Sequence, residues 1–141
     1  MIEANAALIA RRAGRPIAIT AVSARDRSKK RGVDLSPYVW EDDMVILGER
    51  ADVDVVVELV GGSDGSALAC AKATIAAGKA LVTANKAMIA HHGLKLAEMA
   101  EAAKVALKFE AAVAGGIPVI KGLREGAASV PSISKAGSAS A

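Results

Sequence analysis

The sequence predicts an α/β fold built on a parallel β-sheet, and two observations carry this prediction. Short segments rich in Val, Ile and Ala alternate along the chain with segments whose apolar residues recur at helical spacing. A helix between two strands makes a right-handed crossover, which leaves the strands parallel in one sheet. The composition agrees, because 52% of the residues are hydrophobic but only 2% are aromatic, a poor match to a β-sandwich.

The N-terminal third predicts a helix, a strand and a loop. Residues 2–13 place apolar side chains at helical spacing, and Gly14 follows as a stop signal. Residues 17–23 are short and mostly apolar, as expected of a strand covered on both faces. Residues 24–36 are polar and basic and predict a loop. Residues 37–49 fit no single pattern, although their middle part suits a short helix.

The next unit is a strand followed by a helix. Residues 54–60 (DVVVELV) predict a strand, and residues 66–77 predict a helix. The turn between them contains Ser63 and Asp64, either of which can cap the helix. Gly78 then provides a left-handed end to the helix.

The remaining elements repeat this alternation. Residues 80–83 predict a third strand, and residues 86–104 predict a helix with a break near Gly93. Residues 105–110 predict a fourth strand, and residues 118–124 a last helix with Pro at its first position.

The C-terminal segment has a different composition. Residues 127–141 are rich in Ala and Ser and have no apolar periodicity, so we expect a disordered tail. The chain therefore divides into a folded part, residues 1–126, and this tail.

Charge and cysteine content restrict the partners. The net charge is +3, with 18 basic and 15 acidic residues interspersed, which disfavours a nucleic-acid-binding protein. The one basic cluster, residues 25–31, is either a solvated loop or a contact for RNA.

No apolar run is long enough to cross a membrane. Cys70 is the only cysteine and suits helix packing, so we expect a cytoplasmic protein without disulfides and without a membrane partner.

The ends of the predicted strands are the first place to look for function. In open parallel sheets, ligands bind beyond the carboxyl ends of the strands. The four ends here are residues 23–25, 60–62, 83–86 and 110–111. If the strands are neighbours in space, these four ends line one crevice.

Each strand end offers a candidate group and a plainer alternative. Arg25 can pair with a phosphate or can be a surface arginine. Gly61 and Gly62 let the backbone approach a ligand, or simply permit a turn. Lys86 is unfavourable at the positive end of a helix dipole, which suggests a bond to a carbonyl oxygen or an anion, unless it is only an exposed lysine. Residues 110–117 can turn carbonyl oxygens toward a hard cation, or can form a tight turn.

The neighbouring His91 and His92 point about 100° apart on a helix and suit surface or capping roles better than metal binding.

Four segments resemble a known family. The sequences AVSARDRSKKRGVDL, DVDVVVELVGG, AAGKALVTANKAMIAHHG and FEAAVAGGIPVIKGLREG closely resemble the nucleotide-binding region of bacterial homoserine dehydrogenase, over about residues 3–126. This family reduces L-aspartate 4-semialdehyde to L-homoserine with NADPH or NADH, on the route to threonine, methionine and isoleucine. The resemblance implies a Rossmann-like doubly wound sheet, an NADP or NAD cofactor, a small-molecule substrate and a homo-oligomeric full-length enzyme.

The resemblance also implies roles for single residues. Arg25 would lie at the adenosine 2′-phosphate, and Val60 and Gly61 would contact the cofactor through the backbone. Lys86 would lie beside the nicotinamide and the reacting carbonyl, as a catalytic and cofactor-binding residue. A monovalent cation, sodium, would be held mostly by main-chain oxygens of Glu110, Val113, Gly115 and Ile117.

The departures from the family matter as well. In the family a strand and a GxGxxG-type loop precede the helix with which this chain opens, and a substrate and dimerisation domain follows the last helix. We therefore expect residues 1–126 to be a partial NAD(P)-binding domain, and the isolated chain to lack dehydrogenase activity. The alternative is a non-catalytic remnant or interaction protein that retains part of a dinucleotide-binding sheet.

Overall fold

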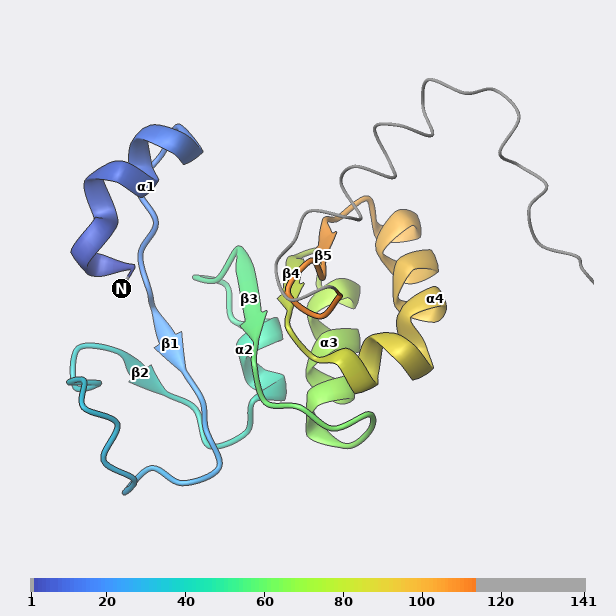
Figure 1. Cartoon of the computed structure of the whole chain (residues 1–141), viewed down its shortest axis with the longest axis horizontal. Helices are drawn as coiled ribbons and strands as arrows, with labels where there is room; N and C mark the ends of the chain where they lie inside the picture. The colour runs from blue at the N-terminus through green and yellow to red at the C-terminus, as the bar shows by residue number, and fades with distance from the viewer. Residues whose placement is uncertain (1, 114–141) are drawn as a thin grey trace, which may run out of the picture.

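The structure, a computed structural model, describes residues 2–113 and confirms the α/β class (Figure 1). Strands are interspersed with helices along these residues. The elements are η1 (Glu3–Asn5), α1 (Ala6–Ala13), β1 (Ala21–Val22), β2 (Val39–Trp40), α2 (Val45–Glu49), β3 (Val55–Glu58), α3 (Ser66–Ala76), β4 (Ala80–Thr83), α4 (Lys86–Ala103) and β5 (Leu107–Lys108).

All strand pairs of the described part are parallel, as predicted, but they form two sheets. β1 pairs with β2, whereas β3, β4 and β5 form a second sheet in that order. Glu58 lies opposite Thr83 in this second sheet, so β3 and β4 end side by side. Figure 1 shows the β1–β2 pair and α1 beside the three-stranded sheet and its helices.

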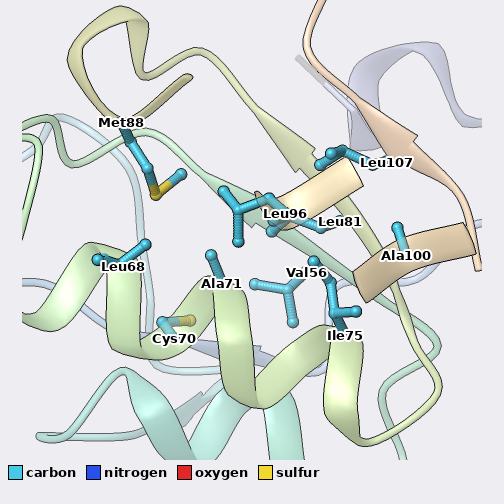
Figure 2. Packing of buried hydrophobic residues seen from close by; sticks show 10 residues of the cluster. All are labelled: Val56, Leu68, Cys70, Ala71, Ile75, Leu81, Met88, Leu96, Ala100 and Leu107. Carbon is cyan, nitrogen blue, oxygen red and sulfur yellow. The ribbon is translucent and has the colours of Figure 1, made fainter. Parts of the chain in front are cut away.

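The core forms where α3 and α4 cover the three-stranded sheet (Figure 2). Leu81 of β4, Ile75 of α3 and the α4 residues Met88 and Leu96 are almost fully buried. Burial of one such side chain typically stabilises a fold by about 1.5–3 kcal/mol. Cys70 lies in the same cluster, and burial raises the pKa of its thiol, so its predicted packing role is confirmed.

Helices α2 and α3 approach each other closely at Gly48. A Cβ atom on Gly48 would lie 2.8 Å from both the backbone nitrogen and the hydroxyl oxygen of Thr74. The Thr74 hydroxyl donates a hydrogen bond of 2.7 Å to the Cys70 carbonyl oxygen, which satisfies it inside α3. The absence of a side chain at Gly48 therefore sets the contact between the two helices.

Several strand limits differ from those predicted. The predicted strands over residues 17–23 and 105–110 pair only over Ala21–Val22 and Leu107–Lys108. Each of these strands has a single neighbour among residues 2–113, which leaves little backbone to pair. β2 lies in residues 37–49, for which the sequence predicted no strand. It forms by pairing with β1, and such a non-local contact leaves no pattern in the local sequence.

Two expectations about helix ends and breaks were wrong. Neither Ser63 nor Asp64 caps α3, because its N-cap is Gly65, which makes no side-chain hydrogen bond. α4 continues through Gly93 without a break. A helical glycine costs about 1 kcal/mol relative to alanine, and the buried Met88 and Leu96 on either side of Gly93 more than offset this cost.

Two predictions lie outside the described residues: the helix over residues 118–124 and the disordered tail over residues 127–141. Within residues 2–113, no helix combines the length and the apolar character needed to cross a membrane.

Candidate functional site

A buried carboxylate joins the ends of β3 and β4. Glu58, the last residue of β3, is only 1% exposed. Its Oε1 atom accepts hydrogen bonds from the backbone nitrogens of Val60 at 2.6 Å and Gly61 at 3.2 Å. Its Oε2 atom accepts a hydrogen bond of 2.5 Å from the Thr83 hydroxyl. The parallel register makes this possible, because it places Glu58 directly opposite Thr83.

The same contacts continue to the start of α4. The Thr83 hydroxyl oxygen accepts a hydrogen bond of 3.0 Å from the Asn85 backbone nitrogen. Asn85 is the N-cap of α4: its side-chain oxygen accepts from the Met88 backbone nitrogen at 3.0 Å. Its side-chain nitrogen donates to the Gly62 carbonyl oxygen at 2.8 Å. The position of Lys86, the first residue of α4, is therefore set from both strand ends. We call Glu58, Thr83 and Asn85 the tip network.

The turn held by the tip network needs glycine for its backbone conformation. Gly61 and Gly62 have φ angles of +87° and +88°, in the left-handed region that favours glycine. A Cβ atom on Gly61 would meet no described atom within 4 Å. The turn is exposed, so a ligand can approach its backbone closely, although the tip network already binds three of its polar groups.

A second contact ties this turn to α4. His92 Nε2 lies 2.9 Å from Asp64 Oδ1, and the Ser63 hydroxyl donates to Asp64 Oδ2 at 2.6 Å. The Ser63 hydrogen bond first, and His92 second, lower the pKa of Asp64 below its ordinary value of 3.8. His91, in contrast, is exposed.

A cleft of about 470 Å³ separates the end of β1 from β3. Arg25 and Arg31 line one side of this cleft, and residues 56–60, including Val60, line the other. Arg25 and Val60, two of the predicted cofactor-binding residues, therefore lie on one cleft. Gly61 and Lys86 do not line it, and the tip network connects them to Val60 instead.

The basic loop that follows β1 is partly ordered by Trp40. The guanidinium groups of Arg27 and Arg31 lie 5.7 and 5.5 Å from the centre of its ring, within cation–π distance. Asp26 accepts two hydrogen bonds from Ser28, which lower the pKa of its carboxyl group. Asp26 is thus satisfied locally and does not pair with Arg25.

Arg25 and Lys86 are the two predicted cationic contacts of a ligand. Both side chains belong to exposed residues. Neither makes a hydrogen bond or an ion pair with another of the residues 2–113. Lys86 also stands at the positive end of α4, where a cation is unfavourable without an anionic partner. Both groups are therefore available to bind an anion or a carbonyl oxygen.

The predicted cation site is only partly within the described chain. Glu110 and Val113 lie in a turn after β5, where the Val113 backbone nitrogen donates to the Glu110 carbonyl oxygen at 3.3 Å. That oxygen retains a second lone pair for a ligand. Gly115 and Ile117 lie outside the described residues. No cluster of three or more His, Cys, Asp or Glu side chains suited to a metal occurs in residues 2–113.

The tip network was not found from the sequence, although two signals pointed to it. Glu58 is the one charged residue in an otherwise apolar strand segment, VVVELV, where a buried carboxylate would need hydrogen-bond donors. Asn85 stands immediately before the helix that begins at Lys86, which is a typical N-cap position. What joins these residues is the pairing of β3 with β4, which no local pattern contains.

Parallel strands whose ends carry a glycine turn and a capped helix start are typical of the Rossmann-like class of nucleotide-binding domains. The chain can be assigned to a family within this class. The family model described as the NAD binding domain of homoserine dehydrogenase matches residues 3–110. The chain belongs to the homoserine dehydrogenase family of oxidoreductases, and the matched region is its NAD-binding domain.

Individual relatives agree with this assignment. The homoserine dehydrogenase of Neisseria gonorrhoeae is 44% identical over 128 residues, which cover 91% of this chain and 29% of that protein. The homoserine dehydrogenase of Corynebacterium glutamicum is 45% identical over 122 residues, covering 82% of this chain and 26% of that protein. The chain thus spans under a third of the length of these relatives.

Solved structures show the same fold. A homoserine dehydrogenase from Thiobacillus denitrificans matches with a TM-score of 0.79 at 39% identity, over 89% of this chain and 28% of that one. The Staphylococcus aureus homoserine dehydrogenase at pH 7.5 matches with a TM-score of 0.72 at 35% identity, over 81% of this chain and 29% of that one. The predicted Rossmann-like fold and the family resemblance are both confirmed.

Proposed function

We propose that this chain supplies the nicotinamide-cofactor side of a homoserine dehydrogenase, which reduces L-aspartate 4-semialdehyde to L-homoserine with NADPH or NADH. The observation that carries the proposal is the juxtaposition at the strand ends. The exposed Val60–Gly62 backbone and the first residue of α4, Lys86, are held together by the tip network. The backbone of Val60 and Gly61 contacts the cofactor, and the open space beside Gly61 suits such an approach.

Arg25 binds the adenosine 2′-phosphate of NADPH in this proposal. It lines the cleft beside Val60 and has no anionic partner among the described residues. The neighbouring Asp26 is turned to Ser28 and leaves Arg25 free to pair with a phosphate. This arrangement favours NADPH over NADH.

Lys86 acts at the reacting carbonyl. A reduced nicotinamide bound here would supply the hydride that the aldehyde carbon accepts. The carbonyl oxygen gains negative charge as that bond forms, and the Lys86 ammonium group donates a hydrogen bond to it. Its exposed position at the start of α4, without an ion-pair partner in residues 2–113, suits this role.

A sodium ion completes the proposal. Oxygen atoms of Glu110 and Val113 would hold it, mostly through the main chain, together with Gly115 and Ile117, because hard cations prefer oxygen ligands. The turn that brings Glu110 and Val113 together supports this proposal.

Cofactor binding tests the proposed function directly. We expect isothermal titration calorimetry of the 141-residue chain to show binding of NADPH, and Arg25→Ala to weaken it about tenfold, the usual loss of a charge-assisted contact. Binding of NADH should change less than twofold, because NADH has no 2′-phosphate.

The matched control is Arg12→Ala, which removes an exposed arginine from α1, outside the cleft. It should leave both affinities unchanged. A wild-type chain that binds neither cofactor would contradict the proposed function and would support the alternative of a non-catalytic remnant.

A further inference from the structure

Glu58 is the only charged residue among the buried residues of the described chain. Its side chain lies on the same face of β3 as Val56, which packs in the core, so an apolar residue would be the ordinary occupant. A buried carboxylate is costly unless donors surround it. All three of its donors lie at the strand ends and none lies in the core. The carboxylate therefore fixes the positions of the two strand ends relative to each other.

We propose that Glu58 and Thr83 are positioning residues that couple the glycine turn after β3 to the start of α4. The proposal rests on the proposed function, because that function gives the turn and Lys86 their roles beside the cofactor. Through this coupling the cofactor-contacting backbone and Lys86 keep a fixed geometry relative to each other.

The coupling runs through two oxygen atoms with different tasks. Oε1 of Glu58 holds the turn through the backbone nitrogens of Val60 and Gly61, and Oε2 holds Thr83. Glutamine is a poorer substitute, because its amide is uncharged and offers one acceptor oxygen and one donor nitrogen. With its oxygen toward the turn, its nitrogen faces the Thr83 hydroxyl, whose proton then loses its buried acceptor, so Glu58→Gln weakens the connection to Thr83.

Thr83 carries the connection into α4. Its hydroxyl donates to Glu58 and accepts from the Asn85 backbone, so both of its hydrogen-bonding roles are used. Asn85 in turn caps α4 and holds the Gly62 carbonyl oxygen. The turn is thus held at three successive residues: Val60 and Gly61 bond to Glu58, and Gly62 bonds to Asn85. Serine preserves the hydroxyl at position 83, whereas valine preserves only the shape.

Thr74 provides a matched control for Thr83. Both threonines are buried, with exposed fractions of 0% and 1%, and the same change to valine removes one buried hydroxyl. The Thr74 hydroxyl bonds within α3 to the Cys70 carbonyl oxygen, away from the strand ends. Thr74→Val therefore tests whether lost stability alone can explain an effect of Thr83→Val.

Amide hydrogen exchange measured by NMR tests the coupling without any cofactor. We expect the Val60 and Gly61 amides to exchange about tenfold faster in Thr83→Val, because Glu58 loses its anchor on the neighbouring strand. Thr83→Ser should restore slow exchange, and Thr74→Val should leave the two amides unaltered relative to the rest of the core. Unchanged exchange in Thr83→Val, or equal acceleration in Thr74→Val, would overturn the proposal.

Cofactor titration adds the functional measurement. Thr83→Val and Glu58→Gln should weaken NADPH binding about tenfold, whereas Thr83→Ser and Thr74→Val should stay within about twofold of the wild type. Wild-type affinity in both Thr83→Val and Glu58→Gln would overturn the positioning role. If the wild-type chain binds no cofactor, the proposed function fails, while the amide exchange still decides whether the coupling exists.

Discussion

At the scale of single residues, polar side chains near the strand ends are satisfied by near neighbours in the chain, by a residue of α4 or by a partner on the next strand. Asp26 bonds Ser28, Asp64 bonds Ser63 and His92, and Glu58 bonds Thr83. The local pairs lower the pKa of their aspartates and are exposed. The cross-strand pair is buried, and its loss would leave an unpaired polar group inside the protein.

The Asp64 carboxylate makes a prediction about acid stability. Because the pKa of Asp64 is lowered on folding, its contribution is fully present above its ordinary value of 3.8 and is lost as pH falls through the lower folded value. We expect Asp64→Asn to lower the unfolding temperature at neutral pH, with a difference from the wild type that shrinks below pH 3.8. Thermal unfolding followed by circular dichroism between neutral and acid pH measures this.

Asp54→Asn is the control, because Asp54 is exposed and no side-chain partner of it occurs in residues 2–113. Thermal unfolding of Asp54→Asn over the same pH range shows how much of the change comes only from replacing an exposed carboxylate. A constant difference for Asp64→Asn across the acid range would contradict the assigned contact.

At the scale of elements, the packing of α2, α3 and α4 explains why helices contain glycine, a residue that disfavours helix formation. α3 lies between α2 and α4 and buries residues on several sides, including Ala67, Cys70 and Ile75. Close approach of α2 depends on Gly48, whereas Gly93 in α4 meets only the Ile89 side chain. Gly48 is therefore required by the contact between α2 and α3, whereas no such contact requires Gly93.

A pair of substitutions separates these reasons. We expect Gly48→Ala to destabilise the fold by about 1–3 kcal/mol, because its Cβ would lie 2.8 Å from the Thr74 backbone, and overpacking exceeds the helix-propensity gain. Gly93→Ala should be neutral or stabilise by up to about 1 kcal/mol, since the nearest atom is a side-chain carbon at 3.4 Å. Urea unfolding measures both, and equal effects of the two changes would refute the close contact.

At the scale of the whole molecule, two separate parallel sheets share one cleft. The β1–β2 pair contributes Arg25 to its wall, and the three-stranded sheet contributes Val60. Lys86 is exposed at the start of α4 and does not line this cleft. The described residues thus bring together groups suited to a cofactor, within a chain that spans under a third of its relatives' length.

We expect the purified 141-residue chain to bind cofactor without catalysing turnover. Lys86 is the one catalytic group that we propose in this chain, which spans under a third of the length of its relatives. NADPH oxidation in the presence of L-aspartate 4-semialdehyde should be equal for the wild type and Lys86→Ala. Wild-type turnover clearly above that of the variant would show that the chain is catalytically sufficient.

Much of the fold could be predicted because the signals are local. The strand Ala80–Thr83 and the starts of α3 and α4 were predicted at the residues where they occur, since each stands between a glycine or asparagine signal and an apolar pattern. β2 was missed and the ends of β1 and β5 were misplaced, because a strand's limits depend on its neighbour.

The α/β class, the main helices, the parallel strands and the family all follow from the chain alone, because periodicity, glycine positions and the family-like segment at residues 83–87 (TANKA) are local properties. The separation of the strands into two sheets and the burial of Glu58 as an anchor depend instead on how distant segments pack. The reason is that Glu58 and Thr83 are 25 residues apart and meet only through the register of β3 on β4.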